Sequence, residues 1–181
     1  MRRTLSILVA DQPGELSRIV GLFSARGFNI EALTVAQTLD ARWSRVTVAT
    51  HGDERTIEQI IKQCARLVRV QQVRPVSDQT HLEREMALVT VDATPGAHRQ
   101  ELLLLARAFG AKIIEIAGAR ATLEITGARR EVAAFIELLR PLGVRDVVRS
   151  GAVAIERLAA SPSAEAAATT EEAWPSSGFD C

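Results

Sequence analysis

An internal repeat constrains the fold of this chain more than any other feature of its sequence. Pro13-Gly14 is matched by Pro95-Gly96 at a separation of 82 residues, and Ile30 is matched by Ile113 at a separation of 83. One inserted residue accounts for the difference. Solenoids need three or more units, so two copies indicate two tandem domains of the same architecture.

Hydrophobic periodicity predicts the elements of each copy. In the first copy we expect strands at 2–10, 29–38, 43–50 and 68–73, and helices at 14–26 and after Asp53. In the second copy we expect strands near 85–93, 112–117, 120–126 and 144–155, and helices at 97–109 and 129–140. The last strand is either continuous or interrupted at Ser150-Gly151. Both copies read βαββαβ, which predicts an α+β fold.

The repeat sets the expected domain limits. The first domain is expected at 1–76 and the second at 81–157. Residues 158–181 are rich in Ala, Ser, Thr, Glu and Pro and lack apolar periodicity, so we expect a disordered tail. Cys64 shares an apolar helical face with Ile57, Ile60 and Ile61, which predicts a buried thiol.

Composition and charge exclude several functional classes. Lys and Arg together number 22, as do Asp and Glu, so the chain lacks the basic excess of nucleic-acid-binding proteins. No apolar run approaches the roughly 20 residues that a membrane span requires, and no signal-peptide pattern follows Met1. We therefore expect a cytoplasmic protein without nucleic-acid or membrane partners.

Motifs for catalysis or metal binding are missing. The three histidines lie far apart, and the sequence has no Cys-x-x-Cys pair, no phosphate-binding glycine loop, no Gly-x-Ser-x-Gly turn and no tyrosine. We therefore expect no catalytic residues and no metal ligands in this chain.

The loop around Asp11-Gln12-Pro13-Gly14 is the best candidate binding site. It precedes a predicted helix, whose first N–H groups at Gly14, Glu15 and Leu16 suit a carboxylate. Asp11 suits an ammonium group, and Asn29 can both donate and accept, so acid and amide could flank one small zwitterion. An ordinary turn with a helix cap explains the same residues equally well.

The second copy bears on these alternatives. Its turn keeps Pro95-Gly96, but Ala93 replaces the acid at Asp11 and Lys112 replaces the amide at Asn29. Polar residues needed only for the fold would be expected in both copies. Their loss favours one ligand-binding domain and one domain with another task.

The segment 11–35, DQPGELSRIVGLFSARGFNIEALTV, together with 5–9, resembles the regulatory small subunit of acetolactate synthase (acetohydroxyacid synthase). Residues 81–88, HLEREMAL, and 149–151, RSG, are similar to the start and end of that family's second domain. The resemblance covers about residues 2–157.

The resemblance implies two ferredoxin-like domains, the first an ACT domain that pairs with a second copy so that an amino-acid site lies at the homodimer interface. It implies a catalytic large subunit holding thiamine diphosphate, magnesium (Mg) and flavin (FAD), while this chain performs no chemistry. The small subunit would activate that partner and convey valine feedback inhibition in branched-chain amino acid biosynthesis.

Family positions carried onto this chain imply a valine site. Gly14 and its neighbours would bind the valine carboxylate, Asn29 and Ile30 would complete the pocket, and Ala36 would lie on the adjacent strand. The family commonly has asparagine where this chain has Asp11. A carboxylate there favours the ligand's ammonium group and repels its carboxylate.

Two other functions fit the residues. A free-standing amino-acid sensor that acts on a transporter or transcription factor needs the same binding loop. An independent enzyme needs a cluster of catalytic residues, and the sequence offers none that we recognise.

Overall fold

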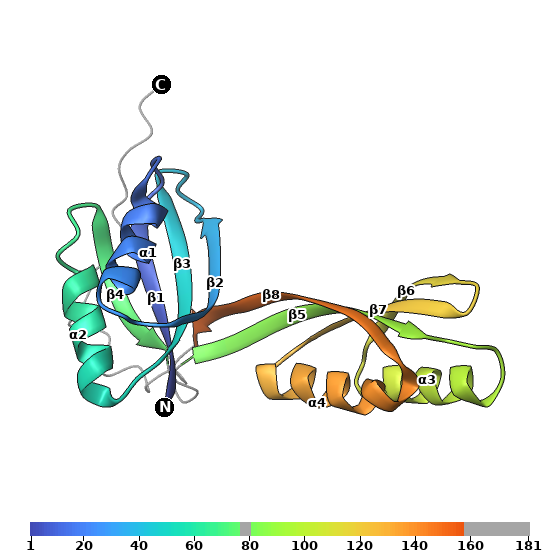
Figure 1. Cartoon of the computed structure of the whole chain (residues 1–181). Helices are drawn as coiled ribbons and strands as arrows, with labels where there is room; N and C mark the ends of the chain where they lie inside the picture. Colours follow the sequence, from blue (N-terminus) through green and yellow to red (C-terminus); the bar gives the residue numbers. More distant parts are fainter. Residues whose placement is uncertain (77–80, 158–181) are drawn as a thin grey trace, which may run out of the picture.

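Two antiparallel sheets of four strands each form the framework of the computed structural model, which describes residues 1–76 and 81–157. Each sheet carries two α-helices on one face (Figure 1). This arrangement confirms the prediction of two tandem ferredoxin-like domains. The segment predicted as a tail, 158–181, lies outside the described residues.

The first domain contains β1 (Arg2–Ala10), α1 (Glu15–Ala25), β2 (Ile30–Gln37), β3 (Trp43–His51), α2 (Glu54–Cys64) and β4 (Val70–Val76). Its strand order is β2-β3-β1-β4, so β2 and β4 are the edges. Asp53 caps α2 by accepting a hydrogen bond from the Thr56 N–H at 2.7 Å, the arrangement that its position before the helix predicted.

The second domain contains β5 (His81–Asp92), α3 (Ala97–Ala108), β6 (Lys112–Ala117), β7 (Arg120–Gly127), α4 (Arg129–Leu139), a short 3₁₀ turn (Arg140–Leu142) and β8 (Val144–Glu156). Its strand order, β6-β7-β5-β8, repeats that of the first domain. The equivalent glycines Gly14 and Gly96 both have positive φ, at 89° and 109°, immediately before a helix. The repeat therefore keeps the strand order and a glycine with positive φ before the first helix of each domain.

Each domain has an aliphatic core between its sheet and its helices. In the first domain, Phe23 and Cys64 of the two helices are fully buried against strand residues such as Leu5 and Ile7. Burial raises the pKa of the Cys64 thiol to about 11, because the apolar surroundings disfavour the thiolate. In the second core, Phe135 of α4 is likewise fully buried.

β5 and β8 are the longest strands, and they extend beyond their own domain toward the first (Figure 1). Thr34 of β2 donates a hydrogen bond to the Ala152 carbonyl of β8 at 2.7 Å. On β1, the Arg2 guanidinium lies 3.5 Å from the Glu83 carboxylate of β5. These contacts join the two domains on the sheet face opposite α1 and α2.

Candidate functional site

The binding loop predicted from the sequence connects β1 to α1. The Asp11 N–H donates to the Arg42 carbonyl at 2.7 Å, which fixes the start of the loop against the β2–β3 turn. Gly14 then takes a left-handed conformation, and α1 begins at Glu15 without a side-chain cap. Because a Cβ at Gly14 would meet no heavy atom within 4 Å, glycine is required there by backbone conformation, not by space.

The start of α1 has unused hydrogen-bond donors. The Glu15 N–H donates to the Gln12 carbonyl at 3.3 Å. Within residues 1–76 and 81–157, the N–H groups of Gly14 and Leu16 donate to no other residue. Two of the three predicted donors are therefore available to an anion at a helix N-terminus.

Asp11 stands beside these donors, and its carboxylate is held in place. Its Oδ1 accepts a hydrogen bond from the Ser44 hydroxyl at 3.0 Å, and its Oδ2 accepts one from the Gln37 side-chain amide. Both partners come from the ends of β3 and β2. The side chain is exposed, so a ligand cation could still reach the carboxylate.

The Glu15 side chain has a structural task. It is buried and forms ion pairs with Arg18 at 3.1 Å and with Arg69 at 3.4 Å. Arg69 also donates to the Gln12 side chain, so these residues fasten the loop to the strand that follows α2. We therefore assign Glu15 to the loop's support, with no side-chain contact to a ligand.

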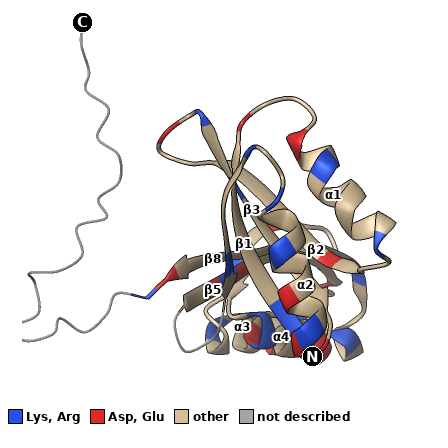
Figure 2. Cartoon of the chain, turned by 90° about the vertical axis from the view of Figure 1, so that its left-hand side faces the viewer, with Lys and Arg blue, Asp and Glu red and all other residues tan. Residues whose placement is uncertain are grey.

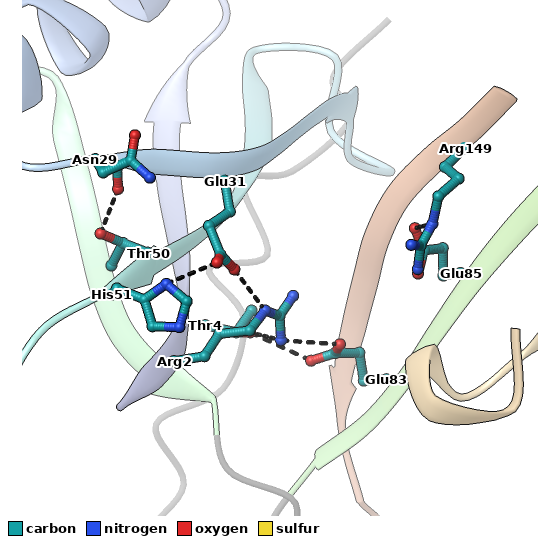
Figure 3. Close-up of polar contacts among 9 residues, drawn as sticks. All are labelled: Arg2, Thr4, Asn29, Glu31, Thr50, His51, Glu83, Glu85 and Arg149. Carbon is teal, nitrogen blue, oxygen red and sulfur yellow. Dashed lines mark hydrogen bonds and ion pairs between the residues drawn. The ribbon is translucent and has the colours of Figure 1, made fainter. Parts of the chain in front are cut away.

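β2 carries two of the predicted site residues, Ile30 and Ala36, and Asn29 immediately precedes it. The Asn29 carbonyl accepts a hydrogen bond from the Thr50 hydroxyl at 2.6 Å, and its side chain is exposed (Figure 3). Ile30 packs partly buried against the first core. Ala36 is exposed and pairs with Arg45 near the other end of the strand.

The structure corrects one expectation about this site. Ile30 pairs with Thr50 and Gln37 with Ser44, so Asn29 and Asp11 lie at opposite ends of β2. A strand of this length spans roughly 25 Å at about 3.3 Å per residue. The acid and the amide of one chain therefore do not flank one small ligand.

The neighbourhood of Asn29 is charged. Glu31 accepts a hydrogen bond from Arg2 at 3.0 Å, and its carboxylate lies 2.6 Å from Nδ1 of His51 (Figure 3). This end of β2 therefore lies next to the contact between the two domains. Sequence spacing does not predict that placement, because these residues belong to three different strands.

The equivalent loop in the second domain is closed. Ala93 repeats the backbone bond of Asp11 by donating to the Ala119 carbonyl at 2.7 Å. The Arg99 guanidinium then donates to the carbonyls of Ala93 and Gly118, at 2.8 and 2.9 Å. A glycine turn before a helix is thus common to both domains, whereas the exposed carboxylate beside that helix start is found in the first, where the second has Ala93.

Ser44 and Gln37 were missed by the sequence reasoning, although they hold Asp11 in position. They flank the predicted turn between two strands, but nothing in their spacing links them to Asp11. The pairing of β3 with β1, which sets Ala10 opposite Trp43, is what brings Ser44 to the loop.

Comparison with known proteins identifies both domains. Residues 5–72 match the family described as "AHAS small subunit-like ACT domain", and residues 84–158 match "Small subunit of acetolactate synthase". Among the described helices, none is long and apolar enough to span a bilayer.

Relatives and a solved structure agree with this assignment. The acetolactate synthase small subunit of Haemophilus influenzae is 43% identical over 158 residues, covering 87% of this chain and 96% of the relative. The isozyme 3 small subunit of Escherichia coli is 41% identical with the same coverage.

The crystal structure of the small subunit from Thermotoga maritima is 39% identical and superposes with a TM-score of 0.80. That match covers 88% of this chain and 99% of the Thermotoga chain. Because both domains match this family and the relatives and the superposed structure agree, the chain belongs to the family of acetolactate synthase small subunits.

Proposed function

We propose that this chain is the regulatory subunit of an acetolactate synthase, that it activates the catalytic large subunit, and that it conveys feedback inhibition by valine. The observation that carries the proposal is the match of both domains to the small-subunit family. Thiamine diphosphate, magnesium and flavin would belong to the large subunit, where the reaction takes place.

The valine site would form between two copies of the chain. β2 is an edge strand that pairs with β3 along one side, so its other side can accept a strand. Antiparallel pairing of β2 with its copy about a two-fold axis would bring opposite strand ends together. Asn29 of the partner subunit would then approach Asp11 and Gly14, which lie far from Asn29 within one chain.

Each group in such a site has a chemical role. The free N–H groups at Gly14 and Leu16 would bind the valine carboxylate, while Asp11 would bind the ammonium group. Ile30 and Ala36 would provide apolar surface near the two ends of the strand. Since Ser44 and Gln37 already donate to Asp11, part of the negative charge is compensated before valine arrives.

Feedback requires that valine bind two states of the assembly with different affinity. A site shared by two chains provides such a difference, since valine would stabilise one arrangement of the dimer. The large subunit would then respond to the arrangement that valine favours.

Reconstitution tests the proposal directly. Adding the full chain to its large subunit is expected to increase the rate of acetolactate formation, and valine is expected to reduce that rate. An unchanged rate would refute the activating role. Valine binding without any effect on the synthase would instead support a sensor for another partner.

Calorimetry tests the site. Asn29→Ala is expected to weaken valine binding to the full chain, with unchanged thermal unfolding because the side chain is exposed. Lys112→Ala changes the equivalent position of the second domain and is the matched control. Equal valine affinity in the two variants would show that the pocket is assigned wrongly.

A further inference from the structure

A large basic cavity lies where the second domain meets the first. Its volume is about 700 Å³, within the range of small-molecule sites. Six arginines and two glutamates contribute to its wall, which gives a formal charge of +4 with histidine neutral. The charged residues are Arg2, Glu83, Arg84, Arg129, Arg130, Glu131, Arg149 and Arg157. Nothing in the proposed valine site accounts for this concentration of charge.

Four of these arginines are held in place by the protein. Arg149 forms a two-point ion pair with Glu85 at 2.8 and 2.6 Å, and Arg2 lies between Glu31 and Glu83 (Figure 3). Arg84 and Arg157 donate to main-chain carbonyls, both at distances near 3 Å. These side chains keep further N–H donors, because a guanidinium carries five.

Arg129 and Arg130 differ from the other four. They are exposed, and within the described ranges, 1–76 and 81–157, neither forms an ion pair or a side-chain hydrogen bond. They occupy the first two positions of α4 (Figure 2 colours all Lys and Arg residues blue). Positive charge at a helix N-terminus is unfavourable because the helix dipole is positive there.

The equivalent helix of the first domain begins with an acidic residue instead of an arginine. There α2 begins with Glu54 after the capping Asp53, so acidic groups face the positive end of the dipole. In α4 the cap position is Ala128, whose N–H donates to the Glu131 carboxylate at 2.8 Å. The backbone N–H groups of Arg129 and Arg130 make no hydrogen bond to any described residue. Within the described residues, the two arginines without a side-chain partner and the start of α4 therefore line the same cavity.

We propose that this cavity binds a small molecule that carries two or more phosphate groups. Guanidinium forks and helix N–H groups are the donors that bind phosphate oxygens best in proteins. A diphosphate would compensate most of the cavity's charge. Because Arg2 belongs to β1 and Arg130 to α4, the ligand would contact both domains.

Inorganic pyrophosphate is the probe, titrated into the full chain by calorimetry at constant ionic strength. Orthophosphate, which can reach fewer arginines at once, is expected to bind more weakly. Arg130→Gln is expected to weaken pyrophosphate binding about tenfold, the loss expected for a charge-assisted hydrogen bond. Arg55→Gln is the matched control because Arg55 holds the same second position in α2 and lies outside the cavity.

Three outcomes would overturn the proposal. The first is that pyrophosphate does not bind the wild-type chain. The second is that Arg55→Gln weakens binding as much as Arg130→Gln, which would indicate attraction by overall charge. The third concerns 158–181, a segment with four acidic residues and no Lys or Arg. If pyrophosphate binds strongly once that segment is deleted but does not bind the full chain, the carboxylates of the segment are the groups that occupy the cavity.

Discussion

Two glycines at the start of the first domain permit a sharp test of its backbone. Gly14 precedes α1 with φ at 89°, whereas Gly21 lies inside α1 with helical geometry. A Cβ added at either position would meet no heavy atom within 4 Å. Gly14→Ala and Gly21→Ala therefore introduce the same methyl group without a steric clash, and they differ in backbone conformation alone.

The two variants should change stability in opposite directions. At Gly14 an alanine must adopt a left-handed conformation, which costs roughly 1–2 kcal/mol. At Gly21 alanine is a better helix former than glycine by about 1 kcal/mol. We therefore expect Gly14→Ala to lower the free energy of unfolding and Gly21→Ala to raise it, with a difference of roughly 2–3 kcal/mol between them.

Urea unfolding measures this difference. The chain has two tryptophans, Trp43 in β3 and Trp174. In a Trp174→Phe background, fluorescence therefore reports on the first domain. If both substitutions stabilise the domain, or if Gly14→Ala leaves it unchanged, the left-handed turn before α1 is not maintained in solution. The assignment of the free N–H groups at this helix would then lose its basis.

The remaining predictions concern titratable groups. The Cys64 thiol, whose pKa burial raises to about 11, is expected to react with a disulfide reagent at mildly alkaline pH only when the chain unfolds. A Cys181→Ser variant isolates that signal, and rapid reaction in the native state would contradict the packing of α2. Hydrogen bonding from Thr56 lowers the pKa of Asp53 below its ordinary value of 3.8, so the ionised cap stabilises α2 above that pH. The gain disappears as the pH falls through the lowered value. The stability difference between wild type and Asp53→Ala, followed by urea unfolding, should shrink over that acidic interval, and a constant difference would exclude the charged cap.

Periodicity predicted the order of the four α-helices and of the first seven strands in the described residues, and the observed bounds differ from the predicted ones where tertiary contacts set the ends of strands. Strand 68–73 was expected to end before Pro75, but β4 continues to Val76. Proline lacks an N–H donor and is accepted there because β4 is an edge strand. That position in the sheet cannot be read from the local sequence.

The last strand shows the same limit. β8 is continuous from Val144 to Glu156, and Ser150 and Gly151 form a bulge, since Glu85 pairs with Ala152 while Ala87 pairs with Arg149. Gly151 adopts a φ of 78° within it. The sequence left open whether this segment is one strand or two. Pairing with β5 decides the question, and the same pairing extends β5 back to His81.

The candidate binding site was predictable only in part. The turn, the glycine and the helix start follow from residues close together in the sequence. By contrast, the distance between Asp11 and Asn29 depends on how β2 pairs with β3, and the support of Asp11 by Ser44 depends on how β3 pairs with β1. Local patterns therefore identified candidate groups, while sheet register determined which of them can meet.

The two domains act as internal controls for each other. Both retain the glycine turn and the strand order, so these features belong to the fold. The exposed acid beside the helix start occurs at α1, while Arg99 donates to two carbonyls of the equivalent loop before α3. Conversely, α2 begins with acidic residues and α4 with two arginines. Arginines at the start of α4 oppose the helix dipole, whereas Asp11 beside α1 is compatible with it, so α4 is the helix start whose residues the shared fold explains least.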